Sequence, residues 1–372
     1  MLFLFYFQAL TSPKSECVTF AQLFKRNSGI QKSVSHLFCY ILLTATYAMC
    51  SVVRTPKVAR TLKQLFGLFF RFPNTLATHK INIYKLAQKR AAMEKKHTQQ
   101  NPYLFNKLLL GNTHFFNHTE NKMLSEGNVK EARENFLSKK FNNLDFLLKH
   151  RYGWMNDFLT NSKTIIEIGC GAGFSQLYIN QKIILTDTIK NEWVDRILDA
   201  TKLELEDDSV DAIIASHNIH HFSSPVKFFW ECERVLKNDG YIIIQEINTS
   251  LLMRLLLKVM RHEGWSYQIN IFDEDQIAND PKDPWSANCA IPELLFEQAK
   301  QFHAKFPSLK IIKNEKNEGF IFPLSGGVIA KTKLPELPTW FLKLIYFIDK
   351  ILIKLFPNIF ALGRSVVIQK NI

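Results

Sequence analysis

Residues 164–174 read TIIEIGCGAGF, and this stretch decides the fold of the chain. The β-branched run TIIEI is typical of a short buried strand. Gly169, Gly171 and Gly173 follow it at alternate positions, which predicts a tight turn whose backbone a ligand can approach closely. The dinucleotide-binding pattern G-x-G-x-x-G is not met, because Phe174 occupies the position of its last glycine.

The glutamate two residues before the first glycine narrows the kind of ligand. Glu167 would repel a pyrophosphate, but its carboxylate can orient the loop and receive an ammonium group. A phosphate-binding P-loop is also excluded, because no Walker lysine follows the glycines. The loop therefore predicts a pocket for a nucleoside that carries a cationic amino-acid part.

Short isoleucine-rich runs recur beyond the loop and alternate with helical segments. We expect further strands over 182–186, 211–216, 241–245 and 365–370. Helical periodicity runs through 129–159, and another helix begins at Ser224-Pro225 and stops at 238–240, which ends in glycine. This alternation predicts an α/β fold with a largely parallel sheet covered on both faces, and a ligand beyond the carboxyl ends of the strands.

Four motifs in order resemble those of class I S-adenosylmethionine-dependent methyltransferases, most closely the ubiquinone and menaquinone biosynthesis type. EIGCGAG resembles the first motif of that family, and ILTD places Asp187 at the end of the second strand. DATKLELEDDSVDAII places Asp199 before the fourth strand, and SHNIHHFSSPVKFFWECERVLKNDGYIIIQE resembles the loop, helix and strand that follow. The resemblance covers residues 145–247 and a final strand at 365–370.

The resemblance implies a Rossmann-like fold with a mostly parallel seven-stranded sheet, and S-adenosylmethionine as the cofactor. Asp187 would hold the ribose hydroxyls, and Asp199 would lie near the adenine amino group. Cofactor binding is expected at Glu167, Gly169, Cys170, Gly171, Gly173, Asp187, Asp199, Ala200, Ser216 and His217. Without a cofactor, the same residues would form ordinary strand-to-helix turns.

A general base is useful if the methyl acceptor is a hydroxyl, and four residues are candidates for catalysis. They are His220, His221, Glu246 and His262. The histidines can equally be loop residues packed beside the cofactor pocket, and Glu246 can be a structural carboxylate. No metal site is expected, because the spacing H-x-x-H-H is not a zinc pattern and no carboxylate or cysteine stands nearby at ligand spacing.

The net charge of +13 comes entirely from the first hundred residues. These hold 15 Lys and Arg against two acidic residues, Glu16 and Glu94, whereas residues 101–372 are balanced. A neutral body lacks the basic surface of a nucleic-acid-binding protein, and the loop after the fourth strand lacks the motif of amino-methylating nucleic-acid enzymes. The six cysteines are scattered, which fits a reducing compartment. We expect no nucleic-acid partner and a cytoplasmic protein.

Residues 1–92 form a basic, acid-poor extension that four interpretations fit. It can be a membrane anchor through the uncharged run 37–53, an organelle-targeting segment, or a helical extension packed on a core or partner. It can also be an over-extended reading frame, with the working protein beginning at Met93. We divide the chain into this extension, a linker at 93–127 and a methyltransferase domain at 128–372.

Three segments in the second half bear on the substrate. Residues 263–300 contain an insertion whose aromatics and prolines suit a substrate lid. Two helices are expected, over 251–261 and over 339–356, and the second carries Lys343, Lys350 and Lys354 on one narrow stripe. A wide apolar arc beside a lysine stripe suits peripheral contact with a membrane, and a buried or dimer-interface helix is the alternative.

The sequence thus predicts an enzyme that transfers a methyl group from S-adenosylmethionine to a hydroxyl of a small, lipid-linked or carrier-linked acceptor. A cofactor-binding but inactive assembly factor is the alternative. A nucleic-acid methyltransferase is the weaker third hypothesis.

Overall fold

The computed structural model describes residues 113–114, 128–139, 141–260, 263–283, 285–329 and 334–371. Its main sheet has seven strands in the spatial order β4-β3-β2-β5-β6-β9-β8. The strands are β2 Ile165–Ile168, β3 Ile184–Asp187, β4 Arg196–Ile197, β5 Val210–Ser216, β6 Leu236–Ile247, β8 Leu309–Asn317 and β9 Gly363–Lys370. Five of them, from β4 to β6 in this order, run parallel to their neighbours.

The last strand of the chain reverses direction within the sheet. β9 inserts between β6 and β8 and is antiparallel to both. The central strands are apolar on both faces, and Ile213, Ile214 and Ile243 are fully buried. Both faces must therefore be covered, as the alternation of strands and helices predicts.

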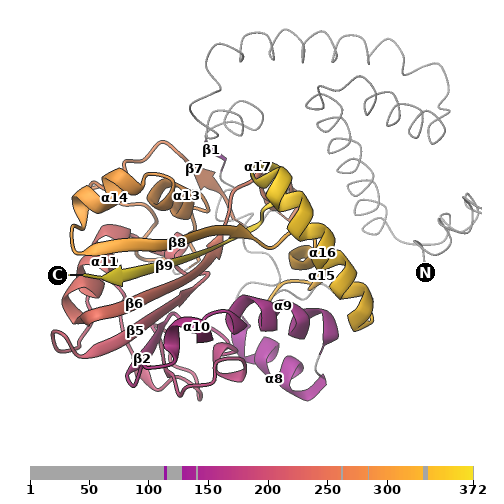
Figure 1. Cartoon of the computed structure of the whole chain (residues 1–372), viewed down its shortest axis with the longest axis horizontal. Helices are drawn as coiled ribbons and strands as arrows, with labels where there is room; N and C mark the ends of the chain where they lie inside the picture. The colour runs from indigo at the N-terminus through magenta and orange to yellow at the C-terminus, as the bar shows by residue number, and fades with distance from the viewer. Residues whose placement is uncertain are drawn as a thin grey trace, which may run out of the picture. The chain divides into compact units, whose positions relative to one another are not determined.

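Helices cover both faces of the sheet, with α8, α9 and α16 grouped at one end of the view and α13 and α14 beyond β8 (Figure 1). Most precede or follow a strand directly. The helices are α8 Val129–Lys139, α9 Asn142–Gly153, α10 Asn156–Leu159, α11 Pro225–Val235, α12 Leu251–Met260, α13 Ile291–Phe296, α14 Ala299–Lys305, α15 Ile321–Leu324, α16 Thr339–Leu355 and α17 Pro357–Phe360. Two short 3-10 helices, η3 Ser175–Leu177 and η4 Ile219–His221, follow the ends of β2 and β5.

Helices α13 and α14 pack against α11 through a cluster of aromatic side chains. Phe229 on α11 is fully buried, and its ring centroid lies 5.0 Å from that of Phe302 and 5.4 Å from that of Phe306. Phe296 on α13 joins the same cluster. Buried phenylalanines contribute large apolar area, so α13 and α14 form part of the core.

The segment expected to be a lid is partly built into this core. A two-stranded antiparallel sheet pairs β1 Thr113–His114 with β7 Trp265–Ser266, and Trp265 is fully buried. At the far end of the segment, Cys289 and Ala290 are also fully buried. The exposed part lies between these ends, where Ile277 is 68% exposed. Opening of this middle part stays a prediction.

Most expected elements are present, with two differences. The helix that begins after Ser224 ends at Val235, so its predicted end at 238–240 is wrong, because Leu236 already pairs with Val210 as the first residue of β6. β8 was not expected, since its sequence LKIIKNEKN is mostly polar. In the described part of the chain, no helix is long and apolar enough to cross a membrane. The run 37–53 and the whole extension 1–92 lie outside the described residues.

Candidate active site

The glycine loop after β2 leaves open space at one of its three glycines. Gly169, Gly171 and Gly173 have φ values of +60°, +51° and +62°, a region that favours glycine. A Cβ at Gly169 would lie 2.9 Å from Asn218 Nδ2, and one at Gly173 would lie 2.8 Å from Trp193 Cδ1. A Cβ at Gly171 would meet no protein atom within 4 Å. The loop therefore forms a cradle at Gly171 that a ligand can enter.

Asp187, at the end of β3, lies beside this cradle, as the sequence predicts. Its carboxylate accepts hydrogen bonds from the backbone N–H of Gly171 at 2.9 Å and of Ile189 at 3.0 Å. A carboxylate has further lone pairs, so Asp187 can still accept hydrogen bonds from hydroxyl groups of a ligand. The predicted pairing of the glycine loop with this acid is present, and its role toward ribose stays a prediction.

Glu167 lies beneath the loop rather than on its surface. Its side chain is 1% exposed and accepts a hydrogen bond from the hydroxyl of Ser175, at the start of η3. Burial raises the pKa of Glu167 to about 8. The carboxyl therefore braces the loop from within, and its predicted contact with an ammonium group remains untested.

Two side chains that the sequence did not indicate hold the carbonyl groups of the loop. Trp193 Nε1 donates a hydrogen bond to the Gly171 carbonyl at 2.8 Å. Arg133 on α8 donates to the carbonyls of Ala172 at 2.5 Å and Gly173 at 3.2 Å, and its guanidinium lies 4.9 Å from the centre of the Trp193 ring. Arg133 reaches the loop only because α8 folds against it, and Trp193 is 22 residues from its partner along the chain, so no local pattern marks either contact.

The remaining predicted cofactor residues lie near strand ends. Asp199 follows β4, is exposed, and accepts two 2.8 Å hydrogen bonds from Thr201, so its carboxylate closes its own turn. Ala200 and Cys170 are buried at 6% and 7% exposure. Ser216 is the last residue of β5 and is half-buried.

His217 leaves β5 in a left-handed conformation, with φ at +53°. Its backbone N–H donates to the Gln245 carbonyl at 2.8 Å, and its ring lies parallel to that of Phe322 with centroids 6.4 Å apart. Burial, and then the nearby Arg151, hold the pKa of His217 well below its usual value. A neutral imidazole thus lines the edge of the sheet where a cofactor is expected.

Two of the residues expected to be catalytic form a buried pair. His220 Nδ1 lies 2.6 Å from Glu246 Oε2, and Glu246 is fully buried. The Glu246 carboxylate also accepts the backbone N–H groups of Ile219 at 2.7 Å and Ile247 at 3.0 Å. Glu246 therefore orients His220, which fits the expected alternative of a structural carboxylate.

Glu263 and Cys289 join this pair from distant parts of the chain. Glu263 Oε2 lies 3.7 Å from His220 Nε2 and 3.2 Å from Cys289 Sγ, and Glu263 Oε1 lies 3.7 Å from His221 Nε2. Burial lowers the pKa of His220, but the carboxylates of Glu246 and Glu263 outweigh it and raise the value to about 10. Burial and the neighbouring His220 lower the pKa of His221 to about 4.

The sequence missed both new members of this cluster because they are remote from the histidines along the chain. The only hint was that Glu263 opens the expected insertion. The fourth expected catalytic residue, His262, lies outside the described residues.

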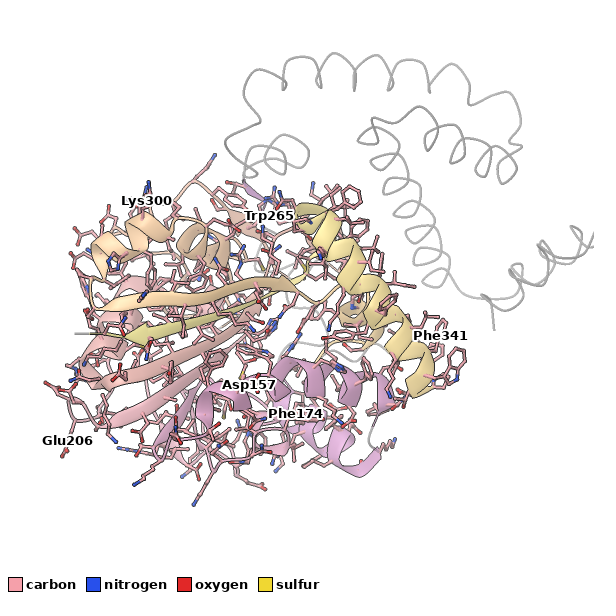
Figure 2. All side chains as sticks on the ribbon, in the orientation of Figure 1. Asp157, Phe174, Glu206, Trp265, Lys300 and Phe341 are labelled. Atoms are coloured by element: carbon pink, nitrogen blue, oxygen red, sulfur yellow. The ribbon has the colours of Figure 1, made fainter. Side chains whose placement is uncertain are left out.

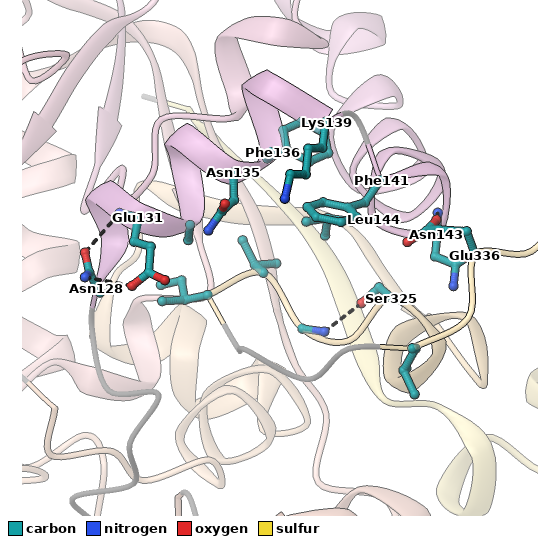
Figure 3. A pocket seen from close by; sticks show the side chains of 15 residues that line it. Asn128, Glu131, Asn135, Phe136, Lys139, Phe141, Asn143, Leu144, Ser325 and Glu336 are labelled. Atoms are coloured by element: carbon teal, nitrogen blue, oxygen red, sulfur yellow. Dashed lines mark hydrogen bonds between the residues drawn. The ribbon is translucent and has the colours of Figure 1, made fainter.

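A cavity of about 620 Å³ lies between α8, α9 and the segment that follows α15 (Figure 3). Its lining includes Phe136, Phe141, Leu144, Val328, Ile329 and Leu334, with polar Asn128, Glu131, Asn135, Asn143 and Glu336. Phe136 also packs against Phe174, which follows the glycine loop and is labelled in Figure 2, with ring centroids 4.8 Å apart. Phe136 thus links the lining of the cavity to the residue that follows the glycine loop.

Comparison with known proteins identifies the core of this domain. Residues 166–244 match the family model of a methyltransferase domain. An S-adenosylmethionine-dependent methyltransferase from Archaeoglobus fulgidus is 18% identical, with 64% of this chain and 99% of that chain covered and a TM-score of 0.39. A second such structure, from Methanosarcina mazei, is 16% identical, with 59% and 98% covered and a TM-score of 0.36. No curated protein matches the chain.

The sheet order, the glycine loop and the family match define a class I methyltransferase domain with a Rossmann-like fold. Residues 166–244 thus belong to a methyltransferase domain, a class for which S-adenosylmethionine is the cofactor. The residues present fit this cofactor, because the open space at Gly171 and the adjoining Asp187 carboxylate suit a ligand that carries hydroxyl groups.

Proposed function

We propose that the enzyme methylates a hydroxyl group of a lipid-linked acceptor at a membrane surface. The observation that carries this proposal is an exposed apolar face on α16, next to the cavity beside the glycine loop. The large apolar lining of that cavity supports a partly apolar acceptor.

The exposed face of α16 consists of six large side chains. Trp340, Phe347 and Leu355 are each more than 60% exposed. The others are Leu344, Ile348 and Ile351. At about 100° per residue, all six fall within an arc of roughly 100°. Such a contiguous apolar patch is unusual on a soluble protein and marks a contact surface.

Lysines border this face along one edge, and the opposite side is anchored. Lys343, Lys350 and Lys354 are exposed and lie roughly 20–60° beyond the edge of the apolar arc. Leu342 and Asp349 are buried on the other side. Among the described residues, half of the surface of α16 faces outward, which supports an interface rather than a buried core helix. An apolar face bordered by lysines fits an interface with anionic lipid.

The N-terminal end of α16 adjoins the cavity. The Leu337 N–H donates to Asn143 Oδ1 at 2.8 Å, and the Thr339 hydroxyl donates to Asn142 Oδ1 at 3.3 Å. Asn143 and Glu336 line the cavity. A head group anchored in lipid beneath α16 would thus be close to the cavity entrance.

The main chemical task of the protein would be to align the acceptor oxygen with the methyl group of the cofactor. When bound, S-adenosylmethionine supplies a methyl group on an already activated sulfonium carbon. The glycine loop and Asp187 would hold the cofactor, and the cavity would bring the acceptor oxygen into line. A hydroxyl acceptor also has to lose its proton. Among the expected catalytic residues, His221 is kept neutral by burial and by the adjacent His220, so its imidazole can accept that proton.

Membrane contact can be tested at Trp340 in the full chain. Anionic vesicles with brominated acyl chains should quench the fluorescence of Trp340, measured as the difference from Trp340→Phe. Replacing Lys343, Lys350 and Lys354 with Glu should abolish this quenching. Three exposed lysines elsewhere, Lys202, Lys300 and Lys310, provide the matched control. Absence of Trp340 quenching at low salt would contradict membrane contact, and a mass that rises with concentration would indicate a dimer interface instead.

The acceptor is tested separately with S-adenosylmethionine labelled in its methyl group. Incubation with a cell extract should yield a labelled, lipid-extractable product whose label is an alkali-stable ether. Label in a water-soluble product would contradict the lipid-linked acceptor. No product with any extract, despite cofactor binding, would favour the inactive assembly factor.

A further inference from the structure

The buried cluster beyond the ends of β5 and β6 contains three different metal-binding groups. His220, Glu263 and Cys289 each offer one ligand atom, and these atoms all lie within 4.8 Å of one another. We propose that these three residues bind a divalent transition-metal cation, with zinc as the best fit. The proposal does not depend on the acceptor, because it concerns metal binding by residues of this chain.

The separations suit one small cation. Zinc bonds of about 2.0–2.3 Å in tetrahedral geometry place neighbouring ligand atoms about 3.4–3.6 Å apart. His220 Nε2 lies 3.7 Å from Glu263 Oε2, which lies 3.2 Å from Cys289 Sγ. The third separation, between His220 Nε2 and Cys289 Sγ, is within 4.8 Å, so side-chain movements of up to about 1 Å would close the three ligands around one cation.

The donor set favours zinc over harder cations. A thiolate, an imidazole nitrogen and a carboxylate oxygen are the ligands that zinc commonly binds, whereas magnesium and calcium prefer oxygen alone. Three protein ligands would leave a fourth position for water or another oxygen, as in catalytic zinc sites. The second oxygen of Glu263 lies 3.7 Å from His221 Nε2.

The outer contacts of His220 are those of a metal ligand. A histidine that binds a metal generally donates a hydrogen bond from its other ring nitrogen to a carboxylate. This bond fixes the tautomer and the orientation of the ring. Here Nδ1 contacts Glu246 at 2.6 Å, and Glu246 is itself held by two backbone N–H groups. Nε2 is thereby directed to the side where Glu263 and Cys289 lie.

The backbone also holds the ligands in place. The His220 carbonyl accepts hydrogen bonds from the Asn288 N–H at 2.9 Å and from Asn279 Nδ2 at 2.8 Å. The Cys289 N–H donates to the Gly264 carbonyl at 2.9 Å. The three ligands come from separate segments, yet these bonds bring them together before any metal binds, which reduces the entropic cost of binding.

The experiment uses the full chain, purified without chelators. The wild type should contain about one zinc ion per chain more than the Cys289→Ser variant does, as measured by elemental mass spectrometry. Titration of the metal-free protein with Co²⁺ should give a thiolate-to-metal absorption band, together with a visible spectrum of tetrahedral cobalt. The difference spectrum between the wild type and Cys289→Ser isolates this site from the cysteines of residues 1–92.

Matched variants separate metal binding from folding. Cys232→Ser removes another fully buried thiol, on α11, and should leave the band and the zinc content unchanged. Glu263→Gln, at a less buried position, should lower the Co²⁺ affinity at least 10-fold. Glu246→Gln should lower it about 10–100-fold while the thiolate band remains, because Glu246 acts through His220. Equal zinc content and equal cobalt spectra for the wild type, Cys289→Ser and Glu263→Gln would overturn the proposal.

Discussion

At the scale of single residues, the cofactor site depends on which glycine of the loop has open space beside it. Gly169 and Gly173 are packed against Asn218 and Trp193, so their substitution would disturb the protein itself. Gly171 is the one of the three loop glycines whose Cβ position is open. The sequence marks all three equally, and only the packing shows which of them faces a ligand.

Trp193 should support cofactor binding through one hydrogen bond. In Trp193→Phe the ring remains but the Gly171 carbonyl loses its 2.8 Å donor. A lost hydrogen bond of this kind costs about 1 kcal/mol, so we expect affinity for S-adenosylhomocysteine to fall about fivefold by calorimetry. Trp230→Phe, on α11, is the control and should bind as the wild type does. Equal affinities for all three proteins would show that this bond does not hold the loop.

Glu167 should make stability depend on pH. Its pKa is raised from 4.5 to about 8, so the folded state favours the protonated form, and stability is lost as the pH rises between these values. Relative to Glu167→Gln, the free energy of unfolding should fall by up to about 1.4 kcal/mol per pH unit from roughly pH 5 to 8. Urea denaturation of the cofactor-free proteins at several pH values measures this. Parallel pH profiles for the two proteins would contradict the assignment.

At the scale of elements, the sequence pattern predicted the central strands, which are apolar throughout, and α16, whose exposed and buried residues recur with helical spacing. It failed at β8, whose LKIIKNEKN carries lysines and is stabilised by pairing with β9. It also failed at the end of α11, where pairing of Leu236 with Val210 overrides the glycine stop. The cluster of His220, Glu263 and Cys289 was not predictable either, since three separate segments of the chain assemble it.

Asp349 should be the residue that fixes α16 to the domain. It is 2% exposed, and its carboxylate accepts the backbone N–H groups of Phe320 and Ile321 at 2.9 Å each. Asp349→Ala leaves both groups without this partner, at a cost of about 1–3 kcal/mol in the free energy of unfolding. Urea denaturation at pH 7.5 measures the loss.

The control is Asp275→Ala, at an exposed position. This variant should be as stable as the wild type. If Asp349→Ala matched it, the docking of α16 would have to rest on apolar contacts such as that of Leu342 alone.

At the scale of the whole molecule, the charge distribution suggests that the extension and the domain are independent. All of the excess positive charge lies in residues 1–100, and the described seven-stranded sheet and its helices use no residue before 128. We expect a chain that begins at Met93 to be folded and to bind S-adenosylhomocysteine with the affinity of the full chain. Circular dichroism and calorimetry check this, and aggregation of the shortened chain alone would show that residues 1–92 belong to the fold.

The central claim, that the cradle at Gly171 binds S-adenosylmethionine, is tested most directly by calorimetric titration of the full chain with S-adenosylhomocysteine. The wild type should bind, and Gly171→Val should show no binding heat, because its side chain would occupy the open space beside Asp187. A matching circular dichroism spectrum would establish that the variant is folded. Unchanged affinity in a folded Gly171→Val protein would contradict the account.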